Sequence, residues 1–358
     1  MVATLTLDGA SVSTAVAKFA IHDADGLIDD DSGAAWQLAN EWATLEFLTE
    51  AAGPDSLPVP EFYGGDKAAG VVVMSDLGTG DSLAEVLLRT DGDVRDVAAG
   101  ERLGAWVDSV ARVHLATFGR TDRYRELRAG LGRTAGADPL QDANLSGAWL
   151  ELSDHLDVEH TAEVTAEIGL IAALIADPGD WDVVSLKDLC PDNNRVHKDG
   201  TVSLFDAQYS GSQHALIDIA YLHATMPTCW CVRRLPDGLA DRLVMRYVDA
   251  LAAGGRQIRA DFTEQLALCR TYMALWRGAG AARHAVLDDG DNRPYWDTYD
   301  FTFPSHRQQL ALRCEQVAEG AALHPRLGAV AAWSARLYTA IRAAWPASEP
   351  LPLYPAFN

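Results

Sequence analysis

The spacing of apolar residues changes once along the chain, near residue 78, and this change limits what the chain can fold into. Before it, strand-like runs occupy residues 4–7, 13–21 and 71–74. After it, apolar residues recur at helical spacing through most of the remaining sequence. The pattern predicts a small β-rich unit, residues 1–78, followed by a large helical unit, residues 79–358.

Two local patterns refine this division. A helix is expected over residues 32–52, because a serine can cap its first turn and a Gly-Pro pair follows its last. Within the helical part, a strand-like run at 183–186 precedes a hairpin whose strands, 195–197 and 201–205, join across an Asp-Gly turn. The fold class expected is therefore α+β.

The charged residues make some classes of partner unfavourable. The chain of 358 residues has 29 Lys and Arg against 51 Asp and Glu, a formal net charge of −22. This charge repels the phosphates of nucleic acids and anionic lipid surfaces, so neither partner is expected. A cationic small molecule would be attracted.

Other patterns favour a cytoplasmic enzyme or binding protein. No run approaches the roughly 18–20 apolar residues that span a bilayer. The first residues show neither the basic segment nor the apolar core of a signal peptide. The five cysteines are scattered and odd in number, so a disulfide framework is not expected.

Lys18 is the first residue that suggests chemistry. Only four of the 29 basic residues are lysines, yet one of them stands in the middle of the expected strand 13–21. Its neighbours on the same face of the strand are Val16 and Ala20, so it projects from an apolar surface. The alternative is an edge-strand lysine whose ammonium group reaches water.

Glu41 gives Lys18 an expected partner. It lies three residues after Leu38 and four before Leu45, on the apolar stripe of helix 32–52. A carboxylate on a buried face costs several kcal/mol unless a cation meets it. A strand lysine paired with a glutamate of the next helix is the device by which kinases hold nucleotide phosphates.

Three further polar residues match the needs of phosphoryl transfer. Asp188 and Asn193 are five residues apart after a strand, and Asp206 ends the second strand of the hairpin, 13 residues beyond Asn193. Phosphoryl transfer needs a carboxylate that activates the acceptor and oxygen ligands for Mg²⁺. We expect Asp188 to be the base and Asn193 and Asp206 to be metal ligands. An Asp and an Asn at this spacing also arise by chance, but the upstream Lys and Glu make chance a poorer explanation.

With these residues in order, the chain resembles the aminoglycoside phosphotransferase and choline-kinase-like group, small-molecule kinases that share the protein kinase fold. The resemblance extends over roughly residues 14 to 222. The matching stretches are residues 15–18, 40–45, 72–78, 110–114, 188–193, 204–206 and 216–220.

The resemblance implies a two-lobed, protein-kinase-like fold with ATP (or GTP) and Mg²⁺ at the lobe junction. Main-chain groups near Ser75 and Leu77 would then bind the purine, and Met74 would line its pocket. Asp218 matches an aspartate that is usually structural. The implied reaction is the phosphorylation of a hydroxyl on a small molecule, such as an amino sugar or an aminoglycoside-like antibiotic.

Two departures from the family pattern support a different function. The family usually has a histidine where this chain has Leu186, which cannot make the same hydrogen bonds. Only 17 residues precede Lys18, so the resemblance implies a truncated small lobe without the first strand and the Gly-rich loop. The alternative function is a pseudokinase that binds a nucleotide or ligand. A protein-substrate kinase is weaker, because no activation segment is recognisable between Asp206 and Asp218.

A stretch near residues 288–300 alternates acidic and aromatic residues and is the candidate substrate site. Carboxylates and aromatic faces suit an amino sugar or another cation. The alternative is an exposed acidic loop whose aromatic rings pack inward. The candidate substrate residues are Asp289, Asp291, Tyr295, Trp296 and Asp297.

Two other features receive structural interpretations. Cys229 and Cys231 flank Trp230 and suggest a metal site, but no second pair of ligands at the usual spacing accompanies them, so packing around the tryptophan is favoured. His114 lies on an apolar helical face and is expected to be a hydrogen-bonded core histidine.

Overall fold

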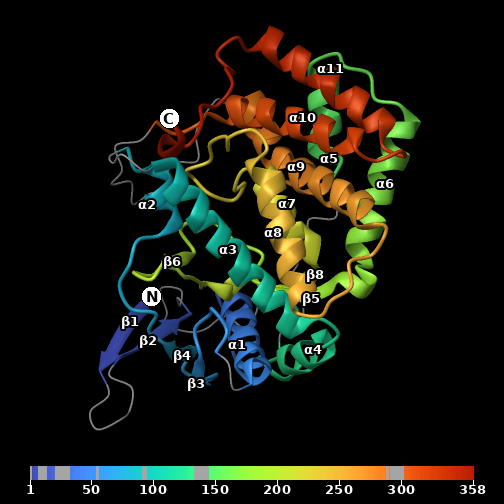
Figure 1. Cartoon of the computed structure of the whole chain (residues 1–358). Coiled ribbons are helices and arrows are strands. Elements are labelled where there is room, and N and C mark those ends of the chain that lie inside the picture. Colours follow the sequence, from blue (N-terminus) through green and yellow to red (C-terminus); the bar gives the residue numbers. More distant parts are fainter. Residues whose placement is uncertain are drawn as a thin grey trace.

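A computed structural model gives the fold of the chain (Figure 1). It describes residues 2–6, 14–20, 33–53, 56–90, 95–132, 145–287, 290 and 302–358. The candidate substrate residues Asp289, Asp291, Tyr295, Trp296 and Asp297 lie outside the described residues.

The N-terminal part forms one antiparallel sheet with strand order β1-β2-β4-β3. Its strands are β1 Val2–Thr6, β2 Thr14–Phe19, β3 Phe62–Asp66 and β4 Val71–Ser75. Helix α1, Gly33–Ala52, covers the sheet and contributes Leu45 to a small core with Val72 and Met74. Three of the strands match the sequence prediction.

Strand β3 was not predicted individually, because two glycines interrupt its pattern of side chains. A bulge between Phe62 and Gly64 shifts its register against β4. Gly65 lies against α1, where a Cβ would be 2.4 Å from a ring carbon of Trp42. A glycine is therefore required for the close approach of strand and helix.

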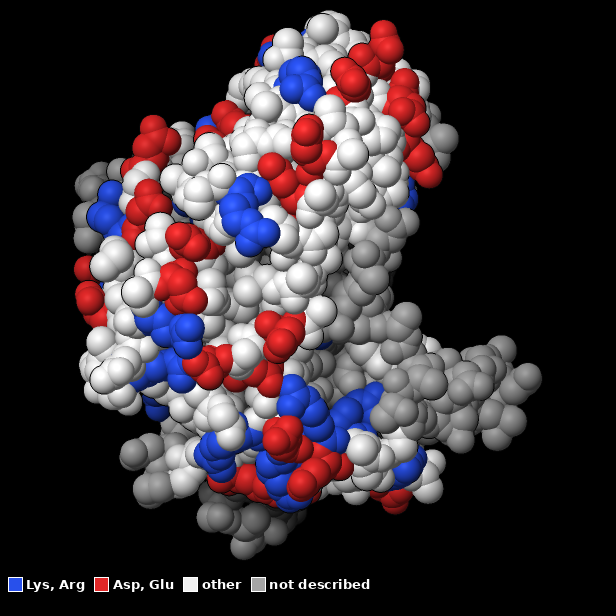
Figure 2. Space-filling view, turned by 90° about the vertical axis from the view of Figure 1, so that its right-hand side faces the viewer, with Lys and Arg blue, Asp and Glu red and all other residues white. Residues whose placement is uncertain are grey.

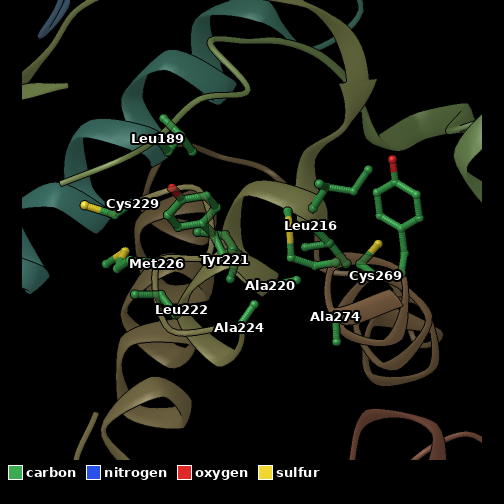
Figure 3. Close-up of a cluster of buried hydrophobic side chains, with 14 of the residues drawn as sticks. Leu189, Leu216, Ala220, Tyr221, Leu222, Ala224, Met226, Cys229, Cys269 and Ala274 are labelled. Carbon is green, nitrogen blue, oxygen red and sulfur yellow. The ribbon is translucent and has the colours of Figure 1, made fainter. Parts of the chain in front are cut away.

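Helices form most of the remaining chain; in Figure 1 α4 lies beside α1 at the level of the sheet, and most of the others lie above it. They bury one large apolar core that includes Trp106, Trp149, Tyr221 and Trp333, and Figure 3 shows the part of it around α7. The helices are α2 Leu83–Leu88, α3 Arg95–Thr117, α4 Thr121–Gly130, α5 Gly147–His155, α6 Ala162–Ala176, α7 Ala215–His223, α8 Leu239–Ala253, α9 Phe262–Leu287, α10 His306–Ala322 and α11 Gly328–Ala344.

The predicted β insertion is present between α6 and α7. Strand β5, Asp182–Ser185, pairs with β8, Gly211–His214, and β6, Asn194–Val196, pairs with β7, Val202–Leu204. The two short ladders bring the loop after β5 beside the segment after β7, so that residues near 188 and 206 become neighbours.

Helix α1 is tied to the segment that follows β7. Asn40 Nδ2 donates to the carbonyl of Gln208 at 3.2 Å, and Gln37 Nε2 donates to the Tyr209 hydroxyl at 3.0 Å. The Ser210 hydroxyl donates to the Asn40 carbonyl at 3.2 Å. These bonds hold one face of α1, which carries Glu41, against the residues after Asp206.

The surface carries charge of both signs. Figure 2 shows acidic side chains spread over the upper part of one face, with basic and acidic side chains interleaved at its lower end. Within the described residues, no helix combines the length and the hydropathy needed to cross a lipid bilayer.

His214 caps helix α7 in its neutral form. Its buried ring accepts a hydrogen bond from the Leu216 main-chain N–H at Nδ1, 3.2 Å away, and donates from Nε2 to Gln265 Oε1 at 2.9 Å. Burial lowers the pKa of His214 to about 4, despite the hydrogen bond to Gln265. Protonation would remove the acceptor that caps the helix.

This pKa predicts a loss of stability in mild acid. Between pH 6.5 and 4 the unfolded chain binds a proton at His214 that the folded chain does not, so stability falls as the pH falls. At pH 5 the penalty is about 2 kcal/mol. In His214→Asn, whose side chain still caps, the difference in unfolding free energy between pH 7 and pH 5 should shrink by about that amount. Urea titrations at both pH values measure it, and parallel pH profiles would contradict the assignment.

Candidate active site

A cleft opens between the small sheet and the β insertion. Its volume is about 300 Å³, near the lower end of the range common for small-ligand pockets. One wall comes from β2, β4 and the linker that follows β4, and the other from the segment around β6 and β7. The lining residues are Val16, Lys18, Glu41, Pro60, Met74, Ser75, Asp76, Leu77, Gly78, Arg195, Phe205 and Asp206.

Lys18 joins three elements at the base of this cleft. Its Nζ atom is 2.6 Å from Glu41 Oε2 on α1 and forms an ion pair and hydrogen bond with Asp206 Oδ1 after β7. Burial lowers the pKa of Lys18, but the charges and hydrogen bonds of the two carboxylates outweigh it and raise the pKa above its ordinary value. The ammonium group therefore stays charged.

Glu41 is the more deeply buried member of the pair, with 3% of its side chain exposed against 21% for Lys18. Burial raises the pKa of Glu41, and Lys18 opposes this shift. The pairing expected from the sequence is present. Its position explains why a carboxylate is tolerated on the apolar face of α1.

Asp206 sits in an uncommon backbone conformation. Its φ and ψ are 64° and 63°, in the left-handed region that residues other than glycine rarely adopt. Such conformations persist where the surrounding structure holds them, often at functional sites. Here the turn ends β7 and directs the carboxylate toward Lys18.

Asp188 lies in the loop after β5. Its Oδ1 atom accepts a hydrogen bond from the Thr228 hydroxyl at 2.5 Å. Burial raises the pKa of Asp188; the Thr228 hydrogen bond opposes this shift and the charge of Asp206 adds to it. Asn193 Nδ2 donates to the Asp188 carbonyl at 3.2 Å, which closes the loop and leaves Asn193 Oδ1 available to a ligand.

Asp218 of α7 holds the loop after β5 in place through hydrogen bonds. The Ser185 hydroxyl donates to Asp218 Oδ1 at 2.9 Å and accepts from the Lys187 main-chain N–H at 2.8 Å. Gln213 Nε2 also donates to Asp218 Oδ1, at 2.6 Å. Leu186, 3% exposed, is part of the hydrophobic core. The loop is thus held by hydrogen bonds of Ser185, and not by Leu186, which occupies the position of the family's histidine.

His114 completes this anchor and is the core histidine that the sequence predicted. Its ring nitrogens lie 2.7 Å from the Tyr247 hydroxyl and 2.8 Å from Asp218 Oδ2. It is 1% exposed. Sequence reasoning missed Ser185, Gln213 and Thr228 as supports of the site, because a lone polar residue next to a strand or in a loop carries no distinctive pattern.

The linker after β4 presents main-chain groups to the cleft. Ser75 is held by Glu61, the residue before β3, since its N–H donates to the Glu61 carbonyl at 2.8 Å and its hydroxyl accepts from the Glu61 N–H at 2.9 Å. Among the described residues, no protein group accepts a hydrogen bond from the Leu77 N–H. Met74, 5% exposed, forms part of the apolar wall.

Comparison with known proteins supports the fold. The structure is similar to the amicoumacin kinase hAmiN in complex with AMP-PNP, Ca²⁺ and Ami, with a TM-score of 0.52 and 12% sequence identity, over 90% of this chain and 86% of that one. The chain has the fold of the protein-kinase-like small-molecule kinases. The α+β class, with a small sheet lobe and a large helical lobe, is thereby confirmed.

Two other solved structures are similar at lower scores. An aminoglycoside phosphotransferase from Alicyclobacillus acidocaldarius subsp. acidocaldarius gives a TM-score of 0.45 at 15% identity, over 92% of this chain and 87% of that one. Choline kinase LicA from Streptococcus pneumoniae gives 0.42 at 14% identity, over 86% of each chain. No protein-family model matches the chain, and no curated protein matches its sequence.

In this fold, the pair of Lys18 and Glu41 should contribute to stability. We expect the coupling between Lys18→Met and Glu41→Gln in a double-mutant cycle to exceed about 1 kcal/mol, because removing one partner leaves the other without its counter-charge. Urea unfolding of the two single variants and the double variant gives the coupling.

A matched control is the surface pair of Arg246 and Asp108, whose side chains are 48% and 42% exposed. Arg246→Met and Asp108→Asn should couple by less than about 1 kcal/mol. Equal coupling in the two cycles would show that the Lys18 pair is an ordinary surface contact.

Proposed function

We propose that the chain is a phosphotransferase that uses ATP (or GTP) to phosphorylate a hydroxyl group of a small molecule. The observation that carries this proposal is the convergence of Lys18, Glu41 and Asp206 in one cleft, from three distant parts of the sequence. The kinase fold supports it, and Asp188 and Asn193 lie in the adjoining loop.

The cleft suits a nucleotide. Met74 and Val16 supply apolar surface for a purine, and the Leu77 N–H, which has no acceptor among the described residues, can bind its edge. Lys18 would meet the phosphates while Glu41 holds its ammonium group in place. The AMP-PNP bound by the amicoumacin kinase supports a nucleotide as the ligand here. We assign Lys18, Glu41, Met74, Ser75 and Leu77 to this part of the site.

Asn193 and Asp206 are suited to bind Mg²⁺. Together they offer an amide oxygen and a carboxylate, the hard oxygen ligands that this cation prefers. Asn193 Oδ1 receives no hydrogen bond from the described residues, which agrees with a role as a ligand. When bound, Mg²⁺ would neutralise charge on the phosphates.

Asp188 would accept the proton of the acceptor hydroxyl. Its Oδ1 atom already accepts a hydrogen bond from one hydroxyl, that of Thr228. The pKa of Asp188, raised by burial, makes it a stronger base than an exposed aspartate. The anchor through Ser185 and Asp218 fixes the loop that carries it, which favours an active enzyme over the pseudokinase that Leu186 had suggested.

The acceptor is proposed to be cationic, such as an amino sugar or aminoglycoside-like compound. The net charge of −22 would attract such a molecule. Asp289, Asp291, Tyr295, Trp296 and Asp297 remain the proposed contacts. The proposed boundary between the nucleotide-binding lobe and the catalytic lobe is residue 78, in the linker between β4 and α2.

The general-base role predicts a selective loss of turnover. A thermal-shift screen of amines, amino sugars and aminoglycosides with Mg·ATP identifies an acceptor, and mass spectrometry of the product gives the rate. Asp188→Asn should lower the turnover by about 10²- to 10⁴-fold and leave the affinity for ATP nearly unchanged.

Asp199→Asn is the matched control for this variant. Asp199 is exposed in the turn between β6 and β7, where its carboxylate accepts a hydrogen bond from the Thr201 N–H. The substitution should therefore leave the turnover within about twofold of the wild-type value. Full turnover in Asp188→Asn would contradict the assignment of the base. Binding of ATP without any phosphorylated product across the screen would favour the pseudokinase.

The assignment of Asp206 as a metal ligand predicts a loss of Mg²⁺-dependent ATP binding. Asp206→Asn removes the charge of the carboxylate, and asparagine tolerates the left-handed backbone at this position. The gain in ATP affinity that Mg²⁺ gives the wild-type chain should disappear in the variant. Calorimetry with and without Mg²⁺ measures this gain, and an unchanged Mg²⁺ dependence would refute Asp206 as a ligand.

A further inference from the structure

Three metal-binding side chains from two segments meet beside the Asp188 loop. The Sγ atoms of Cys190 and Cys229 and a carboxylate oxygen of Asp192 all lie within 4.8 Å of one another. Cys190 and Asp192 follow β5, whereas Cys229 belongs to the loop between α7 and α8. The sequence alone does not predict this cluster, because the two segments are distant along the chain.

The surroundings of these groups resemble a prepared binding site. Trp230 Nε1 donates a hydrogen bond to Asp192 Oδ2, which orients the carboxylate, as partners of metal ligands commonly do. A third thiol, that of Cys231, has its Sγ atom 2.8 Å from that of Cys229. Cys190 and Cys229 are 7% and 3% exposed, so a bound ion would be shielded from water.

We propose that Cys190, Cys229 and Asp192 bind a Zn²⁺ ion and that Cys231, next to Cys229, shifts to complete a set of four ligands. Zinc binds both thiolate sulfur and carboxylate oxygen, and in structural sites it is almost always tetrahedral with four ligands. The site differs in chemistry from that of Asn193 and Asp206, which offers oxygen alone and selects hard cations such as Mg²⁺.

Charge around the thiols also favours a cation. The carboxylates of Asp188 and Asp192 both lie near the Cys190 thiol. A divalent ion would offset these negative charges and stabilise the thiolates, releasing their protons to solvent as it binds. All five cysteines are free, so the sulfur atoms are available to a metal.

Zinc at this position would link the loop after β5, which carries Asp188, to the loop between α7 and α8. The loop between α7 and α8 also supplies Thr228, whose hydroxyl binds Asp188 at 2.5 Å. A metal that joins Cys190 to Cys229 would therefore keep the Thr228 hydroxyl within hydrogen-bond distance of Asp188. The role is structural and does not depend on the proposed phosphotransferase activity.

Cobalt substitution tests the site without any assay of activity. The full chain, reduced and stripped of metal with a chelator, is titrated with Co²⁺ and followed by absorption. We expect thiolate-to-cobalt charge-transfer bands in the near ultraviolet and the intense visible bands of tetrahedral Co²⁺, both abolished by one equivalent of Zn²⁺. An excess of Mg²⁺ should leave them unchanged. The absence of these bands in the wild-type chain would overturn the proposal.

Variants locate the ion. Cys229→Ala and Asp192→Asn should weaken Co²⁺ binding by at least about tenfold. Cys269→Ala is the matched control, because it removes an equally buried thiol that Figure 3 shows on the opposite side of the core from Cys229. Circular dichroism confirms that each variant is folded. Undiminished bands in Cys229→Ala, or their loss in folded Cys269→Ala, would also overturn the proposal.

Discussion

The ion pairs of Lys18 connect the two halves of this molecule. The lysine stands on β2 of the small sheet and meets Glu41 of α1 and Asp206 of the β insertion. Lys18 is only 21% exposed, and its two counter-charges offset the cost of burying most of its charged side chain. The position of α1, the register of β2 and the turn after β7 must therefore all agree for the cleft to form.

Side-chain hydrogen bonds and one backbone turn reinforce this arrangement. Hydrogen bonds from Gln37 and Asn40 to the segment after Asp206 hold α1 across the junction, and the left-handed conformation of Asp206 aims its carboxylate back at the lysine. A second network, centred on Asp218, supports the neighbouring loop through Ser185. The proposed nucleotide cleft and the loop that carries Asp188 are therefore held by two separate networks of hydrogen bonds.

Much of this could be predicted from the sequence, because burying a charge is costly and leaves a visible pattern. Lys18 in an apolar strand and Glu41 on an apolar helical face had to find partners. The Asp-Gly turn fixed the hairpin that carries Asp206. Strand β3 could not be seen individually, because its glycines interrupt the alternation of side chains.

Residues that hold the site only through tertiary contacts could not be predicted from the sequence. Thr228 and Ser185 are single hydroxyl residues whose partners lie far away in the sequence. Nothing in the sequence indicates that Cys190 lies near Cys229. Cys229 and Cys231 were therefore interpreted as packing around Trp230. The structure brings together proposed ligands that are too far apart in the sequence for a spacing rule to connect them.

The most direct test of the account is hydrogen–deuterium exchange of the chain with and without a non-hydrolysable ATP analogue and Mg²⁺. Exchange reports which main-chain amides are protected by the ligand. We predict protection in β2, in the linker at residues 75–78 and around Asn193 and Asp206, with little change in α10 and α11. Protection confined to other parts of the chain, or none at millimolar nucleotide, would contradict the placement of the nucleotide in this cleft.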